Sequence, residues 1–198
     1  MNGNTEELEL KDRLHLIENM IAQGRRTTES WGWTFVLWGV AYYVAIAWSA
    51  WGRPMLAWPV TMIAAGALTG IVASRMSRNQ PETTLGRSIG AVWTAMGISL
   101  FLLMMSLAFS GRIEAHSSIA VVSAILGMGN AASSMILKWK TQFGCAVVWW
   151  ATAVVACFGS DNQSSIAFLA AIFLCLIVFG VYCMIREAQE RKQGAAHA

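Results

Sequence analysis

Residues 89–109 read IGAVWTAMGISLFLLMMSLAF, a run of 21 residues that contains no Asp, Glu, Lys, Arg or His. At a rise of about 1.5 Å per residue, a helix of this length crosses a hydrocarbon core of about 30 Å. A charged side chain at the centre of such a helix costs about 2.5 to 3.5 kcal/mol on membrane-insertion scales. The run therefore predicts a transmembrane helix.

Five more uncharged apolar runs of similar length flank this one. They are Gly32 to Ala50, Met55 to Ser74, Ser118 to Leu137, Phe143 to Gly159, and Ile166 to Ile185. The composition agrees, because hydrophobic residues make up 56% and charged residues 13% of the chain, whereas soluble proteins average roughly 45–50% and about 25%. We predict an all-α polytopic membrane protein with six transmembrane helices, whose first partner is the lipid bilayer.

The basic residues are sorted between alternate gaps of the six runs. Only Arg53 and Arg112, out of fourteen Lys and Arg residues, lie on one side. By the positive-inside rule, the opposite side is cytoplasmic and holds both termini. We therefore expect a multi-pass protein of the cytoplasmic (inner) membrane with N-in and C-in topology. The basic residues on the cytoplasmic side are Lys11, Arg13, Arg25, Arg26, Arg75, Arg78, Arg87, Lys138, Lys140, Arg186, Arg191 and Lys192.

The runs divide the chain into three parts: a cytoplasmic helix and linker (1–31), a transmembrane domain (32–185) and a cytoplasmic tail (186–198). The first thirty residues are rich in acids and hold no compact apolar segment, so we expect no signal peptide. Because the outer gaps are short, we expect three helical hairpins, each closed on the outside. A seven-residue glycine spacing supports this division as a repeat, since it occurs at Gly32 and Gly39 and again at Gly90 and Gly97.

The segment from Thr5 to Arg26 is predicted to be a short amphipathic helix outside the bilayer. Gly24, followed by two arginines, is expected to end it. Its polar positions include Lys11 and Glu18. Apolar residues recur at steps of four, three and four, which is the spacing of one helix face. This seam consists of Leu10, Leu14, Ile17 and Ile21.

An apolar seam on a cytoplasmic helix has to be covered by the membrane surface, the protein's own loops, a sister subunit or another protein. Helices that lie on membranes usually carry a mainly basic polar face. Residues 1–31 instead hold six acidic and four basic residues. The composition therefore favours contact with a sister subunit or a cytoplasmic protein. The helix is too short for a stable coiled coil alone, so pairing would depend on the spans to bring copies together.

The most polar stretch inside a predicted span is Gly127-Met128-Gly129-Asn130-Ala131-Ala132-Ser133-Ser134. An unsatisfied amide is costly in hydrocarbon, so Asn130 needs a hydrogen-bond partner. Gly129 and Ser133 are small residues at a spacing that lets helices approach closely. Two interpretations remain for Asn130, Ser133 and Ser134: they serve helix packing, or they contact a solute and line a pore.

Catalytic and metal-binding patterns are missing from the sequence. No span carries paired carboxylates, a His and Cys ligand set or an activated nucleophile. His15 and His116 stand alone and are expected to be solvated, and the four cysteines form no CxxC pair. The basic residues border spans and do not form one basic face. We therefore expect no enzyme activity, no metal or other cofactor and no nucleic-acid partner.

The segment from Ile17 to Arg26 leads through Thr27-Thr28-Glu29-Ser30 into Trp31-Gly32-Trp33-Thr34-Phe35-Val36-Leu37-Trp38-Gly39. In this part the chain resembles small uncharacterised bacterial inner-membrane proteins, in which a short amphipathic helix precedes a first span with a Leu-Trp-Gly sequence. The resemblance covers roughly the first fifty residues. It implies a bacterial cytoplasmic membrane and no particular activity.

Two functional hypotheses follow. The first is a non-enzymatic membrane component or scaffold that makes protein contacts through its N-terminal helix. The alternative is a small permease or channel for an uncharged solute, lined in part by Asn130.

Overall fold

The computed structural model describes residues 3–52, 54–77, 84–112 and 114–196, which form helices joined by short turns. One of these helices, η1, is a π-helical segment that links α7 to α8 without a break. In chain order they are α1 (Gly3–Ser30), α2 (Gly32–Ala50), α3 (Pro54–Ser77), α4 (Thr84–Phe109), α5 (Ala115–Leu137), α6 (Lys140–Phe158), α7 (Asp161–Ile172), η1 (Phe173–Val178) and α8 (Phe179–Ala196).

Within the described ranges, six helical stretches are long and apolar enough to cross a membrane. Each coincides with one of the runs predicted from the sequence. The prediction of an all-helical chain with six helices of membrane-spanning length is therefore confirmed. The six stretches are Gly32–Ala50, Leu56–Arg75, Leu85–Phe109, Ala115–Leu137, Lys140–Phe158 and Asp161–Glu190.

Several helix ends differ from the sequence-based expectation, among them the start of the last span and the end of α1. The last span starts at Asp161, before the apolar run, because Ser160 and Gln163 form a capping box that nucleates the helix in the polar turn. In α1, the helix continues through Gly24 to Ser30 and breaks only at Trp31. Gly24 is therefore not a helix stop. A Cβ at this position would lie 2.5 Å from Leu85, so the glycine permits close packing of α1 on the bundle.

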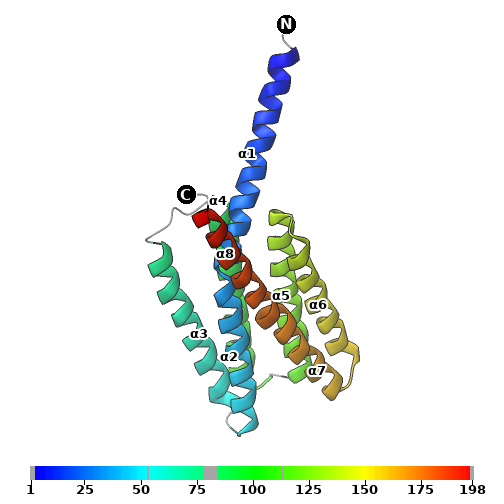
Figure 1. The fold of residues 1–198 in the computed structure, drawn as a ribbon. Coiled ribbons are helices and arrows are strands. Elements are labelled where there is room, and N and C mark those ends of the chain that lie inside the picture. Colours follow the sequence, from blue (N-terminus) through cyan, green and yellow to red (C-terminus); the bar gives the residue numbers. More distant parts are fainter. Residues whose placement is uncertain (1–2, 53, 78–83, 113, 197–198) are drawn as a thin grey trace.

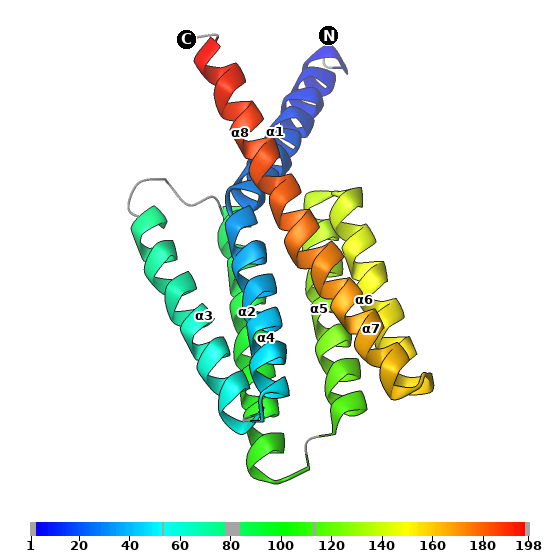
Figure 2. The ribbon, with the colours of Figure 1, turned by 60° about the horizontal axis from the view of Figure 1, so that its bottom comes forward.

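Both termini lie at the same end of the molecule (Figures 1 and 2). The α2 to α3, α4 to α5 and α6 to α7 connections lie at the opposite end. Helix α1 projects well beyond the spanning helices, and α8 projects beside it in a different direction (Figure 2). The N-terminal helix thus stands at the end to which the sequence assigns the cytoplasmic loops.

The closest helix pair in the bundle is α5 with α6, which run antiparallel after a tight turn. Lys138 makes this turn in the left-handed region with a φ of 49°, and the Trp139 N–H donates to the Ser134 carbonyl at 2.9 Å. The two helices belong to different predicted hairpins and are joined at the end that holds the termini. The three-hairpin division consequently stays a prediction, because the tightest packing lies across it.

Aromatic rings connect α2 to α4 and to the last span. Phe35 makes edge contacts with Phe179 at 5.3 Å and with Trp93 at 5.8 Å between ring centroids. Backbones meet at the Gly32 and Gly180 crossing of α2 and α8, where a Cβ on Gly180 would lie 2.8 Å from the Gly32 carbonyl oxygen. These contacts hold the start of α2 against the last span. Helix α1 precedes α2 and is separated from it only by the break at Trp31.

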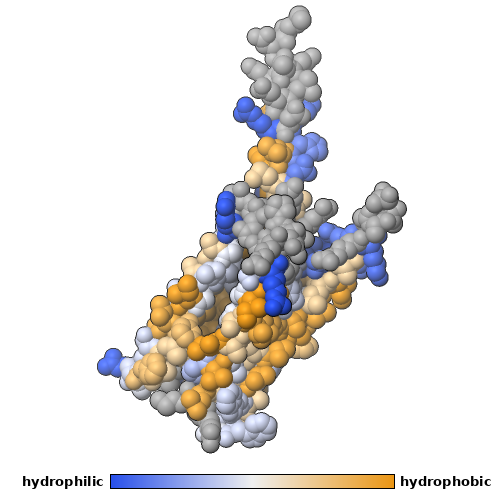
Figure 3. Space-filling model, turned by 90° about the vertical axis from the view of Figure 1, so that its left-hand side faces the viewer, coloured by the Kyte–Doolittle hydropathy of each residue, from blue (hydrophilic) through white to orange (hydrophobic). Residues whose placement is uncertain are grey.

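Helices α3 and α4 cover the outside of the molecule and are mostly exposed. Only 17% of the apolar window of α3 and 6% of that of α4 are buried inside the chain. Apolar surface runs along the bundle in the space-filling view (Figure 3). In a bilayer, lipid tails solvate this surface, so its exposure requires no protein partner.

Candidate functional site

The three polar residues predicted in the fourth span all lie buried on α5, but each uses a different partner. The Asn130 amide nitrogen donates to the Leu126 carbonyl of its own helix at 2.9 Å. Ser134 donates to the Ala131 carbonyl at 2.7 Å. Ser133 accepts a hydrogen bond from the Trp93 indole N–H at 3.0 Å, which ties α5 to α4. The structure therefore does not join these side chains into one polar cluster.

Buried polar atoms without hydrogen-bond partners lie on both α5 and α6. Among the described residues, the Asn130 Oδ1, the Ser123 Oγ, the Trp149 indole nitrogen and both amide atoms of Gln142 form no hydrogen bond. Ser123 and Asn130 lie seven residues apart on α5, as do Gln142 and Trp149 on α6, so each pair shares a helix face. An unsatisfied buried polar atom costs roughly 1–3 kcal/mol, so a small polar molecule such as water that reached these atoms would offset that cost.

The sequence does not identify Gln142 as a buried polar residue, because the apolar run begins only at Phe143. In the structure it is fully buried in the first turn of α6. The signal that identifies it is the buried face that continues through Cys145, Ala146 and Trp149 at helical spacing.

His116 lies where the far ends of α5, α6 and α7 meet, away from the termini. Its Nδ1 is 3.0 Å from the Ala156 carbonyl oxygen and 3.3 Å from the Ser164 hydroxyl, and its Nε2 contacts the Asp161 carboxylate. The sequence pattern does not reveal these contacts, because the three partners lie forty to forty-eight positions away in the chain. It joins three helices and is only partly exposed.

Serine, histidine and aspartate thus meet in one place, yet their bonding does not match a hydrolase triad. In a triad the serine donates to an unprotonated imidazole nitrogen. Here the buried Ser164 hydroxyl donates to the Ser160 carbonyl at 3.0 Å. The imidazole faces an acceptor at each nitrogen, the Ala156 carbonyl and the Asp161 carboxylate, so these contacts favour the doubly protonated form of His116. The arrangement serves to hold helix ends together.

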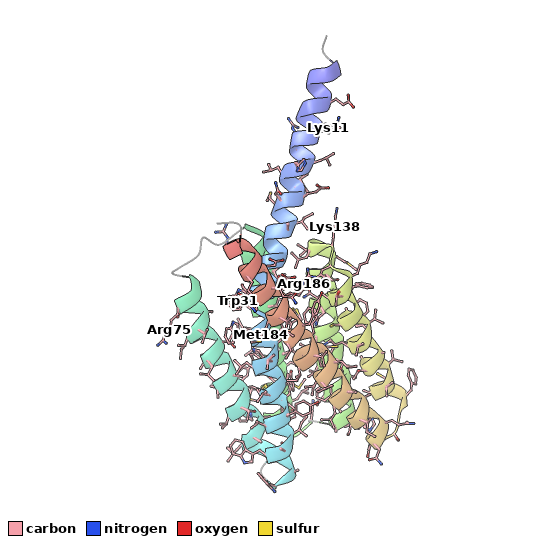
Figure 4. The ribbon with its side chains drawn as sticks, viewed as in Figure 1. Lys11, Trp31, Arg75, Lys138, Met184 and Arg186 are labelled. Carbon is pink, nitrogen blue, oxygen red and sulfur yellow. The ribbon has the colours of Figure 1, made fainter. Side chains whose placement is uncertain are left out.

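A second joint fixes α1 to the last helix. Glu29 at the end of α1 is buried, and its Oε1 lies 3.9 Å from the Arg186 Nε of α8. Arg186, Trp31 and Met184 gather at this joint (Figure 4). Beside it, a shallow cleft of about 270 Å³ is lined by Trp33, Met184, Glu187 and Ala188. The joint sets the direction in which α1 leaves the bundle.

The predicted seam of α1 lies on the projecting part of the helix. Leu10, Leu14 and Ile17 are 60%, 53% and 51% exposed, and Ile21 is half-buried. Apolar side chains are visible between hydrophilic ones on this projection (Figure 3). Leu16 is equally exposed but lies on another face, because it is two residues from Leu14.

The cysteines and possible metal ligands give no sign of a reactive centre. Cys145, Cys175 and Cys183 are buried, and the Cys175 thiol donates weakly to the Cys145 carbonyl at 3.6 Å. No group of three His, Cys, Asp or Glu residues that could hold a metal ion occurs in the ranges that the structure describes. Packing accounts for these cysteines.

Comparisons with protein-family models, with curated proteins and with solved structures found no significant match to this chain.

Proposed function

We propose that the chain is a non-enzymatic component of a bacterial cytoplasmic membrane that makes protein contacts through α1. In this proposal both termini are cytoplasmic and α1 is an amphipathic contact helix. The observation that carries it is the exposed seam of Leu10, Leu14 and Ile17 on a helix that projects from the bundle.

The direction of α1 favours a protein partner over the lipid surface. A helix that binds a membrane surface lies in the interface with its apolar face against the acyl chains. Helix α1 instead extends past the ends of the spanning helices, and Lys11 lies far from the bundle (Figure 4). The acidic excess of residues 1–31 also opposes binding to anionic lipid.

Purification in mild detergent with its neighbours tests the proposal. We expect a stable complex that is lost when Leu14 and Ile17 are both replaced by Asp, because the charges enter an apolar contact. Leu16→Asp is the matched control, since Leu16 is 62% exposed but outside the seam. Equal loss with Leu16→Asp, or retention of the complex in the double variant, would contradict a contact through the seam.

A second candidate function is a passive route for a small uncharged solute. The unpaired atoms of Asn130 and Gln142 favour it, because a polar solute could satisfy them. Flux of a small neutral solute into proteoliposomes should then fall several-fold in Asn130→Leu, while gel filtration shows a folded protein. Unchanged flux, or no flux above that of empty liposomes, would exclude this candidate.

A further inference from the structure

We propose that the seam of α1 pairs with the same seam of a second copy of this chain, as a short parallel coiled coil. This inference rests on the proposed function, since it names the partner of the same helix.

The spacing of the seam fits one coiled-coil register. In a heptad labelled a to g, Leu10 and Ile17 occupy d positions, and Leu14 and Ile21 occupy a positions. These are the positions that interdigitate with a partner helix. The exposed surface of α1 therefore has the pattern of half of a coiled coil.

Charges beside the seam complement each other between copies. In a parallel pair, a residue at g contacts the residue five positions later, at e, on the other helix. Arg13 at g then faces Glu18 of the second copy. This pair has opposite sign, and two-fold symmetry produces it twice. A heterologous partner would not explain this self-complementarity.

Membrane topology restricts the pair to the parallel arrangement. Two copies with the same orientation in one bilayer present their α1 helices on the same side and in the same direction. The paired stretch is bounded at both ends. On one side, the preceding a position is Glu7, and pairing there would bring two carboxylates together. On the other side, the next d position is Gly24, where this face of α1 packs on Leu85 and Leu137 of its own chain.

A stretch from Leu10 to Ile21 is less than two heptads, too short to pair as a free peptide. Confinement of two copies in one bilayer supplies the high effective concentration that such a weak contact needs. The contact between Glu29 and Arg186 adds to this, because it ties the base of α1 to α8 before a second copy binds.

Disulfide trapping in native membranes tests the inference. With the exposed native cysteine removed by Cys157→Ser, Leu14→Cys should form disulfide-linked dimers under mild oxidation, because facing a positions meet. Asn19→Cys is the matched control, since position f points away from the partner. We expect several-fold more dimer from Leu14→Cys. Equal yields from the two variants would overturn the inference.

Charge reversal supplies an independent readout in the Leu14→Cys background. Arg13→Glu and Glu18→Arg should each lower the dimer yield several-fold, whereas the double variant should restore it by re-forming pairs of opposite sign. A double variant as poor as the single variants would overturn the pairing. If dimers do not form but Leu14→Asp with Ile17→Asp still abolishes a complex, the inference fails and the proposed function stands.

Discussion

His116 shows how a single residue acquires a role that depends on three helices. Its Nδ1 faces the Ala156 carbonyl of α6 and its Nε2 faces Asp161 of α7, while Glu114 adds a further negative charge at the start of α5. A neutral imidazole can donate from only one nitrogen, so it would leave one of these acceptors facing a lone pair. The contact is complete only in the protonated form.

We expect the folded protein in detergent to be more heat-stable at about pH 5.5 than at about pH 8, the window in which histidines usually lose their charge. The stabilising contact is present at the lower pH and is lost as the pH rises. His116→Gln should reduce this difference in unfolding temperature, whereas His15→Gln, on exposed α1, should leave it unchanged. The same pH difference in wild type and His116→Gln would contradict a charged histidine at this junction.

At the scale of helices, the neighbours of each glycine distinguish close helix crossings from open helix faces. Gly32 and Gly39 pack against the last span, and a Cβ on Gly32 would lie 2.9 Å from the Gly180 carbonyl oxygen. Gly90 and Gly97 share the same spacing but meet nothing within 4 Å among the described atoms. The shared spacing therefore does not reflect a shared packing role.

Gly32→Ala should lower the free energy of unfolding by about 1–3 kcal/mol, because backbone atoms block the added methyl group and cannot rotate away. Gly90→Ala is the matched control and should be neutral or slightly stabilising, since alanine favours helix. Thermal unfolding in detergent measures both. A Gly90→Ala loss as large as that of Gly32→Ala would show that α4 has a partner on that face.

At the scale of the whole molecule, basic residues gather at the end where α1 projects. Arg75, Lys138 and Arg186 all lie there (Figure 4), and Arg112 follows α4 at the opposite end. A bilayer that follows the positive-inside rule would place this end in the cytoplasm. Both α1 and the end of α8 would then be available to cytoplasmic proteins.

Cysteine labelling in a Cys157→Ser background tests this orientation. Asn162→Cys should react with a membrane-impermeant maleimide added to intact cells, whereas Lys192→Cys should react only after the membrane is opened. Both side chains are exposed, so access depends on the side of the membrane alone. Labelling of both positions from the same side would contradict the proposed six-span topology.

The sequence alone determined the number and positions of the six apolar helices and the separation of basic residues between their two ends. Both properties are local, because they depend on the transfer of each segment from water into lipid. It also indicated the α1 seam, whose side chains need no tertiary contact to share a helix face.

Only the tertiary structure decided which helix faces meet. It brought His116 to Asp161, placed Gly32 against Gly180, and left Asn130 and Gln142 with unpaired atoms. Helices in lipid are apolar on every side, so the period of the sequence does not reveal how each is rotated about its axis. That rotation follows from close packing between segments far apart in the chain, which local sequence patterns do not encode.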